Sequence, residues 1–225
     1  MIDKRVRTLA EAVAGIRDGS TILAGGFGSA GIPNALFGAL LELGVRDLTV
    51  VSNNAGSGKY GLSALIDAGL VRKVICSYPR TSGSQSFEAA YKANKIELEL
   101  VPQGTMSERM RAAGAGIGGF FTPTSAGTRL GEGKETRMIN GRLHVFEPPL
   151  PGDVAFVRAH RADRWGNLVY RMSSRNLNPV CAMAAKMTIA EVGQIDELGQ
   201  LDPEVIGTPG IFVHRIVQTA EVRPS

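Results

Sequence analysis

The sequence has 225 residues, of which 44% are apolar and 20% charged, and its formal net charge is +4. This is enough chain for one large domain or two small ones. No apolar run reaches the ~18 residues of a membrane-spanning helix, and the N-terminal stretch MIDKRVRTLAEAV has acidic residues and no apolar signal core. Lys and Arg are scattered singly, which disfavours a nucleic-acid-binding surface. We therefore expect a cytoplasmic protein that binds neither membrane nor nucleic acid.

Cysteine and histidine usage argues against disulfide and metal chemistry. Cys76 and Cys181 lie far apart and form no C-x-x-C motif, so we expect two reduced, buried thiols. The three histidines, at positions 144, 160 and 214, are separated from one another and from the cysteines. We expect no metal site.

Strand-like and helix-like patterns alternate along the first 120 residues. The expected strands lie at 21–24, 47–54, 72–78 and 96–101, and the expected helices at 8–16, 34–43, 61–70, 86–95 and 105–116. Thr8 and Glu11 form a capping-box pattern at the first helix. In the second, Leu36, Leu40 and Leu43 fall on one helical face, and Gly44 is expected to end the helix.

The composition changes after residue 120. Residues 120–152 are rich in Gly, Pro and Thr and include the turn-forming pair Asn140-Gly141, which predicts an irregular insertion with a small β-hairpin. Further strands are expected at 153–163, 166–171, 185–192 and 210–216, and a helix at 179–186. The alternation predicts an α/β fold with an open, mostly parallel sheet and flanking helices. No linker divides the chain, so we expect residues 1–225 to form a single domain.

The segment STILAGGFGSAGIPN, residues 20–34, contains the dinucleotide-type spacing G-x-G-x-x-G at Gly26, Gly28 and Gly31. A dinucleotide fold also needs an acidic residue at the end of the second strand, where this chain has VVSNNAG. The same spacing recurs in GAGIGG, after a predicted helix. GSGKY and GEGKE lack the rest of a phosphate-loop motif, and no G-x-S-x-G hydrolase motif occurs. These observations disfavour a nicotinamide or flavin site.

Physical chemistry leaves two interpretations of this glycine-rich turn. Gly25, Gly26 and Gly28 remove side chains where a strand meets a helix, so a ligand could approach the backbone. Pro33 suits the first helical turn, and free N–H groups there would suit a phosphate or an oxyanion. Alternatively, the glycines only permit tight packing of the strand and the helix.

Several segments, in order along the chain, resemble the A (alpha) subunit of family I coenzyme A transferases. They are GGFGSAGIP, SNNAG, VPQGTMSERMRAAGAGIGGFFTPTSAGT, EGKET, DRWGNLVYRMSSRNLNPVCAMAAK and LDPEVIGTPGIFVHRI. The resemblance implies a ping-pong reaction in which a glutamate attacks an acyl-CoA thioester and then carries CoA as a glutamyl thioester. CoA thioesters are substrates in this family, and no tightly bound cofactor is expected.

The resemblance also implies a partner chain. The family carries its nucleophilic glutamate in a Ser-Glu-Asn-Gly motif of the B (beta) half, and this sequence contains no such motif. We therefore expect the chain to be inactive without a B subunit, with which it would form an A2B2 heterotetramer.

Matching positions with the family assigns candidate site residues. Asn53, Asn54 and Gln103 fall near the reacting centre, where neutral amides could donate hydrogen bonds to a developing oxyanion. Without the family, Asn53-Asn54 and Pro102-Gln103-Gly104 would be ordinary polar turns. The segment that the family assigns to CoA comprises Gly25, Gly26, Phe27, Gly28, Ser29, Ala30 and Gly31.

The acceptor acid is indicated by SYPRTSGSQSFEAAY, residues 77–91. Family members that act on acetoacetate tend to have S-Y-V-G-E-N at this place, whereas Pro79-Arg80 resembles the 3-oxoadipate branch. Arg80 could bind the second carboxylate of 3-oxoadipate, although a single loop arginine is more commonly solvated. Transfer from succinyl-CoA to acetoacetate remains an alternative, as does a non-catalytic or isomerase-like member of the broader fold.

Overall fold

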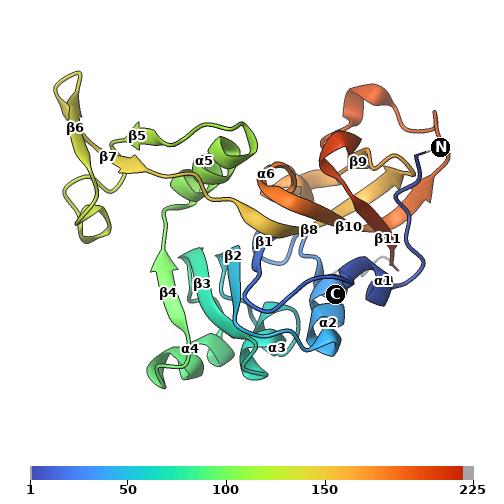
Figure 1. Cartoon of the computed structure of the whole chain (residues 1–225), viewed down its shortest axis with the longest axis horizontal. Coiled ribbons are helices and arrows are strands. Elements are labelled where there is room, and N and C mark those ends of the chain that lie inside the picture. The colour runs from blue at the N-terminus through green and yellow to red at the C-terminus, as the bar shows by residue number, and fades with distance from the viewer. Residues whose placement is uncertain (1, 220–225) are drawn as a thin grey trace.

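One large, mostly parallel sheet forms the centre of the molecule (Figure 1). The computed structural model describes residues 2–219. The strand order is β11-β10-β8-β1-β2-β3-β4, with β9 paired antiparallel to β8. The strands are β1 (Thr21–Ala24), β2 (Leu48–Asn54), β3 (Val71–Tyr78), β4 (Glu97–Leu100), β8 (Gly152–Asp163), β9 (Leu168–Val169), β10 (Ala185–Asp196) and β11 (Arg215–Gln218). The predicted open α/β sheet with flanking helices is confirmed.

Helices cover both faces of this sheet, so its strands are apolar on both sides. Ile22 and Leu23 are adjacent in β1 and fully buried, yet Ile22 packs in the core under α1–α4 and Leu23 in the core under α5 and α6. The helices are α1 (Leu9–Val13), α2 (Asn34–Leu43), α3 (Leu62–Asp67), α4 (Gln85–Lys92), α5 (Gln103–Gly114) and α6 (Asn178–Ala184). Short 3-10 turns are η1 (Arg129–Gly131), η2 (Met172–Arg175), η3 (Pro203–Val205) and η4 (Gly210–Phe212).

The predicted cap of α1 is present, with one difference. The Thr8 hydroxyl accepts a hydrogen bond from the Glu11 N–H at 3.1 Å. In a capping box, the Glu11 carboxylate would accept from the N–H of Thr8. Here it accepts instead from the N–H of the preceding residue, Arg7, at 2.7 Å.

Helix α2 has the predicted bounds but differs from the prediction at Leu43 and Pro33. Gly44 ends it with a φ of 73°, the left-handed conformation expected there. Leu36 and Leu40 are fully buried, but Leu43, in the last turn, is 42% exposed. The helix begins at Asn34, so Pro33 precedes its first turn instead of occupying it.

The expected insertion forms a small separate sheet, which we call the arm (residues 120–147). Its strands are β5 (Phe120–Thr122), β6 (Thr136–Ile139) and β7 (Arg142–Glu147), in the order β5-β7-β6. The predicted hairpin turn is confirmed, since Asn140 and Gly141 both have positive φ, at 50° and 74°. The sequence analysis missed β5, which is only three residues long.

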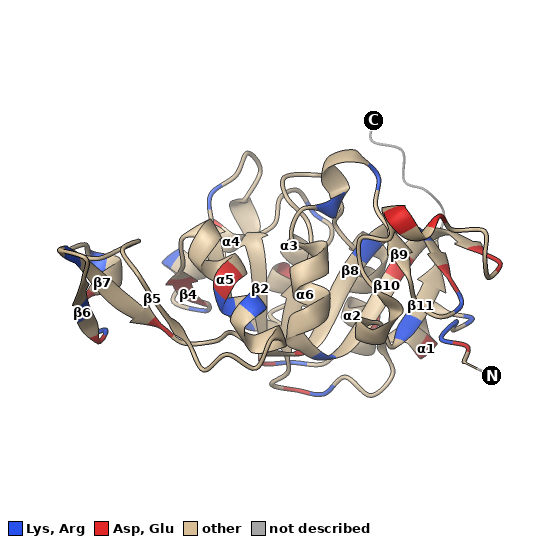
Figure 2. Cartoon of the chain, turned by 90° about the horizontal axis from the view of Figure 1, so that it is seen from above, with Lys and Arg blue, Asp and Glu red and all other residues tan. Residues whose placement is uncertain are grey.

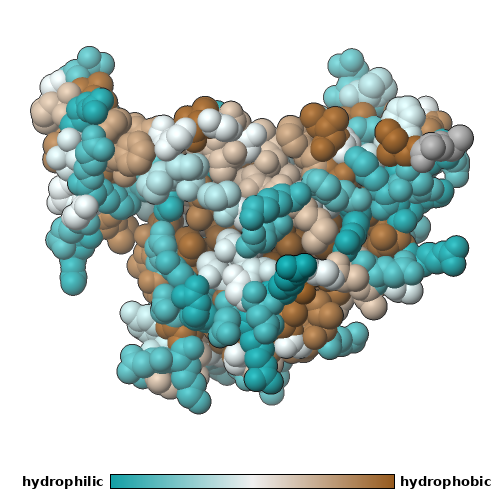
Figure 3. All heavy atoms as spheres, in the orientation of Figure 1, coloured by the Kyte–Doolittle hydropathy of each residue, from teal (hydrophilic) through white to brown (hydrophobic). Residues whose placement is uncertain are grey.

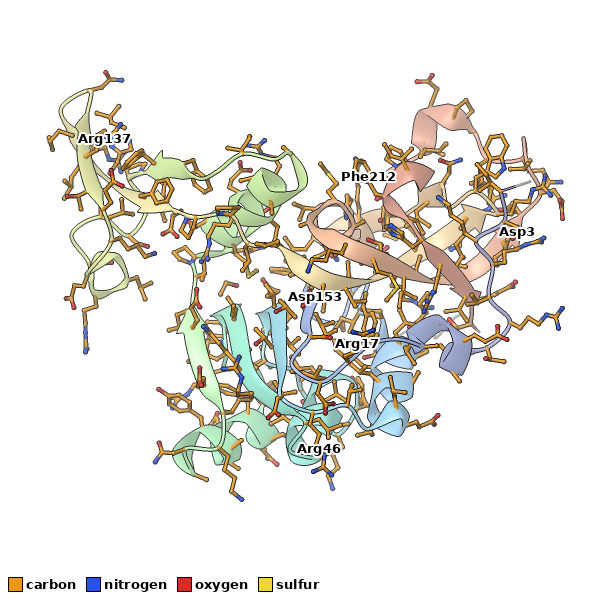
Figure 4. The ribbon with its side chains drawn as sticks, in the orientation of Figure 1. Asp3, Arg17, Arg46, Arg137, Asp153 and Phe212 are labelled. Carbon is orange, nitrogen blue, oxygen red and sulfur yellow. The ribbon has the colours of Figure 1, made fainter. Side chains whose placement is uncertain are left out.

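The arm has an aromatic centre and a charged attachment to the body. Phe121 and Phe146 meet edge to face at 5.4 Å, and the Arg137 guanidinium lies 4.4 Å from the Phe121 ring (Figure 4). At the base, the fully buried Glu147 pairs with Lys134 of the arm and lies 3.9 Å from Nε of Arg109 in α5. Figure 3 shows the arm as a lobe at the upper left, largely covered by hydrophilic residues.

Two expected strands in the C-terminal third are shorter than predicted. Only Leu168–Val169 of residues 166–171 form a strand. Residues 210–212 form η4 instead of a strand, because Pro209 precedes them and the Gly210 N–H bonds to the Asn167 side chain at 2.8 Å. Strand β11 begins only at Arg215.

In the view of Figure 2, Lys and Arg are interspersed with Asp and Glu along the ribbon, and neither sign is confined to one part of it. Between residues 2 and 219, no helix combines the length and apolar character needed to cross a bilayer.

Candidate active site

A pocket of about 110 Å³ opens where β1 and β2 end. It lies between the glycine-rich turn and the residues that follow β2, at the carboxyl edge of the sheet, where open α/β sheets bind ligands. Its polar lining includes Ser29, Asn34, Ser52, Asn53, Asn54, Ser57 and Tyr60. No carboxylate, thiol or amine belongs to the lining residues, so the pocket offers hydrogen bonds but no strong nucleophile.

The glycine-rich turn is a tight loop. Gly26, Gly28 and Gly31 have φ values of 116°, 59° and 68°, in the region that favours glycine. Phe27 and Ala30 exchange two backbone hydrogen bonds of 3.0 Å, which places Gly28 and Ser29 at the tip. Within the described residues, the N–H groups of Gly28 and Ser29 have no partner, so they are free to bind a ligand.

Two asparagines at the start of α6, Asn176 just before the helix and Asn178 as its first residue, contact this loop. The Asn176 side chain accepts from the Gly26 N–H at 3.0 Å and donates to the Ala30 carbonyl at 3.1 Å. A Cβ atom on Gly25 would lie 1.9 Å from Oδ1 of Asn178, and one on Gly31 would lie 2.5 Å from a backbone oxygen of η2. Gly25 and Gly31 therefore permit close packing, whereas a Cβ atom on Gly28 would meet no atom within 4 Å.

The N-terminus of α2 does not match the expectation of free N–H groups. The N–H groups of Ala35 and Leu36 donate to Oε2 of Glu191 at 2.9 and 3.2 Å. Glu191 projects from β10, is 1% exposed and pairs through Oε1 with Arg158. A buried side-chain carboxylate thus occupies the position where an anionic ligand was expected.

Asn53 and Asn54 both line the pocket. Oδ1 of Asn53 accepts from the Ser77 hydroxyl at 3.2 Å, and Oδ1 of Asn54 accepts from the Gly56 N–H at 2.9 Å. Both amide oxygens are therefore engaged, while neither NH2 group has a hydrogen bond to a described residue. The Asn54 contact is the ordinary polar turn that was the alternative interpretation, and it also fixes the amide's orientation.

Gln103 and Arg80 lie at the same edge of the sheet but do not line this pocket. Gln103 is the first residue of α5, directly after β4. Arg80 follows β3, with its side chain 71% exposed and its Nε 4.0 Å from Oε1 of Glu88. Its loop is joined to the pocket wall, because the Gly58 N–H bonds to the Gly83 carbonyl at 3.0 Å. The structure therefore brings together the glycine-rich turn and the two asparagines, with Gln103 and Arg80 placed further along the edge.

Cysteine and metal chemistry find no support in this site. Both cysteines are free and buried, as predicted, and burial raises the pKa of each thiol to about 12. Among the residues that the structure describes, no group of three His, Cys, Asp or Glu side chains is placed to hold a metal ion.

The sequence analysis missed several supporting residues. Ser77 orients Asn53, Asn176 and Asn178 shape the glycine-rich turn, and Glu191 closes α2. The available signal for Glu191 was its position as an acidic residue within the apolar run AKMTIAEV. Its target, 155 residues earlier in the chain, could not be inferred from local pattern.

Comparison with known proteins agrees with this architecture. Residues 6–219 match the family described as coenzyme A transferase. The chain is 59% identical over 217 residues to the A subunit of 3-oxoadipate CoA-transferase from Pseudomonas putida, covering 96% of this chain and 94% of that one. It is 49% identical over 218 residues to the A subunit of succinyl-CoA:3-ketoacid coenzyme A transferase from Xanthomonas campestris, covering 96% and 89%.

Solved structures share the fold at lower identity. An acyl-CoA transferase from Escherichia coli O157:H7 has a TM-score of 0.83 and 21% identity, and the match covers 100% of this chain but 48% of that one. Glutaconate coenzyme A-transferase from Acidaminococcus fermentans also has a TM-score of 0.83, with 23% identity over 96% of this chain and 76% of that one. On the family match and the close relatives together, the chain belongs to the coenzyme A transferase family.

Proposed function

We propose that the chain is the A-type half of a CoA-transferase that moves CoA from succinyl-CoA to a 3-oxoacid, and that this acid is 3-oxoadipate. The relatives named for 3-oxoadipate are 59% and 54% identical to the chain, against 49% for one named for 3-ketoacids. Transfer to acetoacetate is the second candidate, supported by the relatives named for 3-ketoacids.

The observation that carries the proposal is the chemistry of the pocket. Its lining supplies amide and backbone donors but no carboxylate, and the chain contains no Ser-Glu-Asn-Gly sequence. Such a site can stabilise an oxyanion but cannot form a glutamyl thioester. We therefore assign the nucleophilic glutamate to a B subunit, in an A2B2 heterotetramer.

In the first half-reaction, a carboxylate oxygen of the partner's glutamate attacks the succinyl thioester carbon, and CoA leaves as the thiolate. The thiolate then attacks the glutamyl carbonyl of the resulting anhydride, which gives a glutamyl-CoA thioester and releases succinate. The acceptor carboxylate reverses these steps: it forms a new anhydride, and CoA returns to the acceptor's acyl carbon. Each attack places negative charge on a carbonyl oxygen.

We propose that hydrogen-bond donors at the carboxyl edge of the sheet bind that oxygen. The free NH2 groups of Asn53 and Asn54 and the amide of Gln103 are neutral, so they bind an oxyanion without pairing with the glutamate. We propose that the glycine-rich turn, residues 25–31, contacts CoA, with the free N–H groups of Gly28 and Ser29 as its donors.

We propose Arg80 as the residue that selects the acceptor. The second carboxylate of 3-oxoadipate must be paired with a charge when it loses water. Between residues 2 and 219, the one ion-pair partner of Arg80 is Glu88, at 4.0 Å, so a substrate carboxylate can replace that partner.

The remaining proposals concern the whole chain. Strands from both ends of the sequence share one sheet, which favours residues 1–225 as a single CoA-transferase alpha-type domain. We propose a cytoplasmic enzyme with no tightly bound cofactor, for which the CoA thioester is a substrate.

The test is reconstitution. CoA transfer from succinyl-CoA to 3-oxoadipate and to acetoacetate is assayed with the purified chain, with the co-expressed pair and with the isolated B subunit. We expect activity only in the pair, with a higher kcat/KM for 3-oxoadipate. Turnover by the chain alone would contradict the assignment of the nucleophile, and preference for acetoacetate would favour the second candidate.

A further inference from the structure

A second polar groove, of about 420 Å³, runs between α5 and the arm. We call it the α5 groove. Its walls come from the first turns of α5 and from β5 with the residues after it, and they include Gly104, Thr105, Ser107, Phe120, Thr122 and Thr124. Four of these residues have a side-chain hydroxyl, and the ring of Phe120 forms an apolar wall.

The N-terminus of α5 opens without a cap. Pro102 stands at the N-cap position and makes no side-chain hydrogen bond to the helix. Within the described residues, the N–H groups of Gln103, Gly104 and Thr105 have no partner, because the first N–H that bonds back is that of Met106, to the Pro102 carbonyl at 2.8 Å. Helix α5 is 12 residues long, so its dipole adds to the partial positive charge there.

Thr105 gives an independent indication of a ligand. It is 5% exposed and lines the groove, yet its hydroxyl forms no hydrogen bond with any residue between 2 and 219. The rest of the side chain is enclosed, and the hydroxyl is not among the fully buried atoms, so it is open to the groove. The hydroxyl is therefore suited to a group that enters the groove.

We propose that the α5 groove binds the carboxylate at the far end of a dicarboxylic acyl group. This inference rests on the proposed function, since it takes Gln103, the first residue of α5, to contact the reacting centre. The far carboxylate of such an acyl group is only a few carbon atoms from the thioester, whereas the CoA phosphates lie beyond the long pantetheine chain. The acyl chain would lie against Phe120.

The electrostatics favour a singly charged group. The donors are neutral, and the one acidic residue of the groove, Glu108, is paired with Arg111 at 2.7 Å.

The binding test needs no turnover. Calorimetry compares succinate with butyrate, an acid of equal length and a single carboxylate, on the A–B complex in wild-type, Thr105→Val and Thr105→Ser forms. Thr136→Val makes the same change at an exposed position of β6 and serves as the control. We expect Thr105→Val to weaken succinate binding about tenfold and leave butyrate unchanged, with Thr105→Ser close to wild type. Equal weakening of both acids, or none for succinate, would overturn the proposal.

The kinetic test uses the same variants. Thr105→Val should lower kcat/KM for 3-oxoadipate about tenfold, mainly through KM, and leave the value for acetoacetate unchanged. Inhibition by free CoA should not change; if it weakens instead, the groove binds a CoA phosphate and the proposal is wrong. A wild-type complex that cannot use 3-oxoadipate would contradict the proposed function, while the succinate measurement would still test the groove.

Discussion

Among the helices that begin at the carboxyl edge of the sheet, α2 and α5 have N-termini with different surroundings. Helix α2 follows the glycine-rich turn, and its first N–H groups are bound by the buried Glu191 carboxylate. Helix α5 follows Pro102 without a glycine motif, and its first N–H groups are open beside the unpartnered Thr105. The N–H groups of α2, which follows the glycine motif, are thus already bound by Glu191. Those of α5, which follows no such motif, have no partner among residues 2–219.

This difference shows that a glycine-rich turn and a helix dipole are separate features. The glycines of residues 25–31 shape a loop that can approach a ligand, but the protein has filled the helix terminus behind it with its own anion. We propose that donors for a ligand in that pocket come from the loop tip and from the amides of Asn53 and Asn54. At α5, the proposed donors belong to the helix terminus itself.

The closed terminus should be essential for stability. Glu191→Gln keeps the side chain's size but removes the charge that faces Arg158, and breaking a buried ion pair costs about 3–5 kcal/mol. We expect a loss of this size in the free energy of unfolding, measured by denaturant titration. Glu97→Gln, at an exposed pair with Arg72, should cost less than about 1 kcal/mol. Equal losses in the two variants would show that Glu191 is not a stabilising cap.

If α2 is closed, the oxyanion depends on amide side chains. Asn53→Ala should lower kcat of the A–B complex by roughly two orders of magnitude, because losing one oxyanion donor costs about 3 kcal/mol. Gln103→Ala should act in the same direction, and both should change CoA affinity less than kcat. Gln85→Ala, at the exposed start of α4, is the control. Full turnover in folded, assembled Asn53→Ala would identify that residue as structural.

The β3–β4 side of the edge should set acceptor choice. Arg80→Ala should lower kcat/KM for 3-oxoadipate about tenfold to a hundredfold, since a hydrogen bond to a charged group contributes about 1.5–3 kcal/mol. The value for acetoacetate should hardly change. Arg46→Ala, an exposed arginine at the opposite end of the sheet, should affect neither acceptor (Figure 4). Equal slowing of both acceptors by Arg80→Ala would exclude it as the discriminating residue.

We expect the smallest effect, no change in the melting temperature, when NAD is added. The second strand ends in asparagines without a ribose-binding acid, and Glu191 occupies the α2 terminus where a pyrophosphate would bind. A ligand of the native state at a hundred times its Kd would add about 2.7 kcal/mol of stability. We expect no change in Tm with NAD at millimolar concentration, and a clear rise would reopen the dinucleotide interpretation.

Local patterns predicted most of the sheet, whereas the candidate site residues came from the resemblance to the family. Strand β1 has the predicted bounds, Gly44 ends α2, and the Asn140-Gly141 turn joins β6 to β7, because each depends on residues that are neighbours in sequence. Contacts between distant residues were not predictable in this way. Glu191 caps a helix that begins 157 residues earlier, and Asn178 meets Gly25 across the β1–α6 contact. The open state of α5 also needed the structure, since it depends on which N–H groups lack partners.

The most direct test of the account is the location of the covalent intermediate. The A–B complex is incubated with succinyl-CoA without an acceptor, and the intact mass of each chain is measured. We predict a CoA adduct on the partner chain, lost on addition of 3-oxoadipate, and an unchanged mass for this chain. A CoA adduct on this chain would contradict the assignment of the nucleophile to the B subunit.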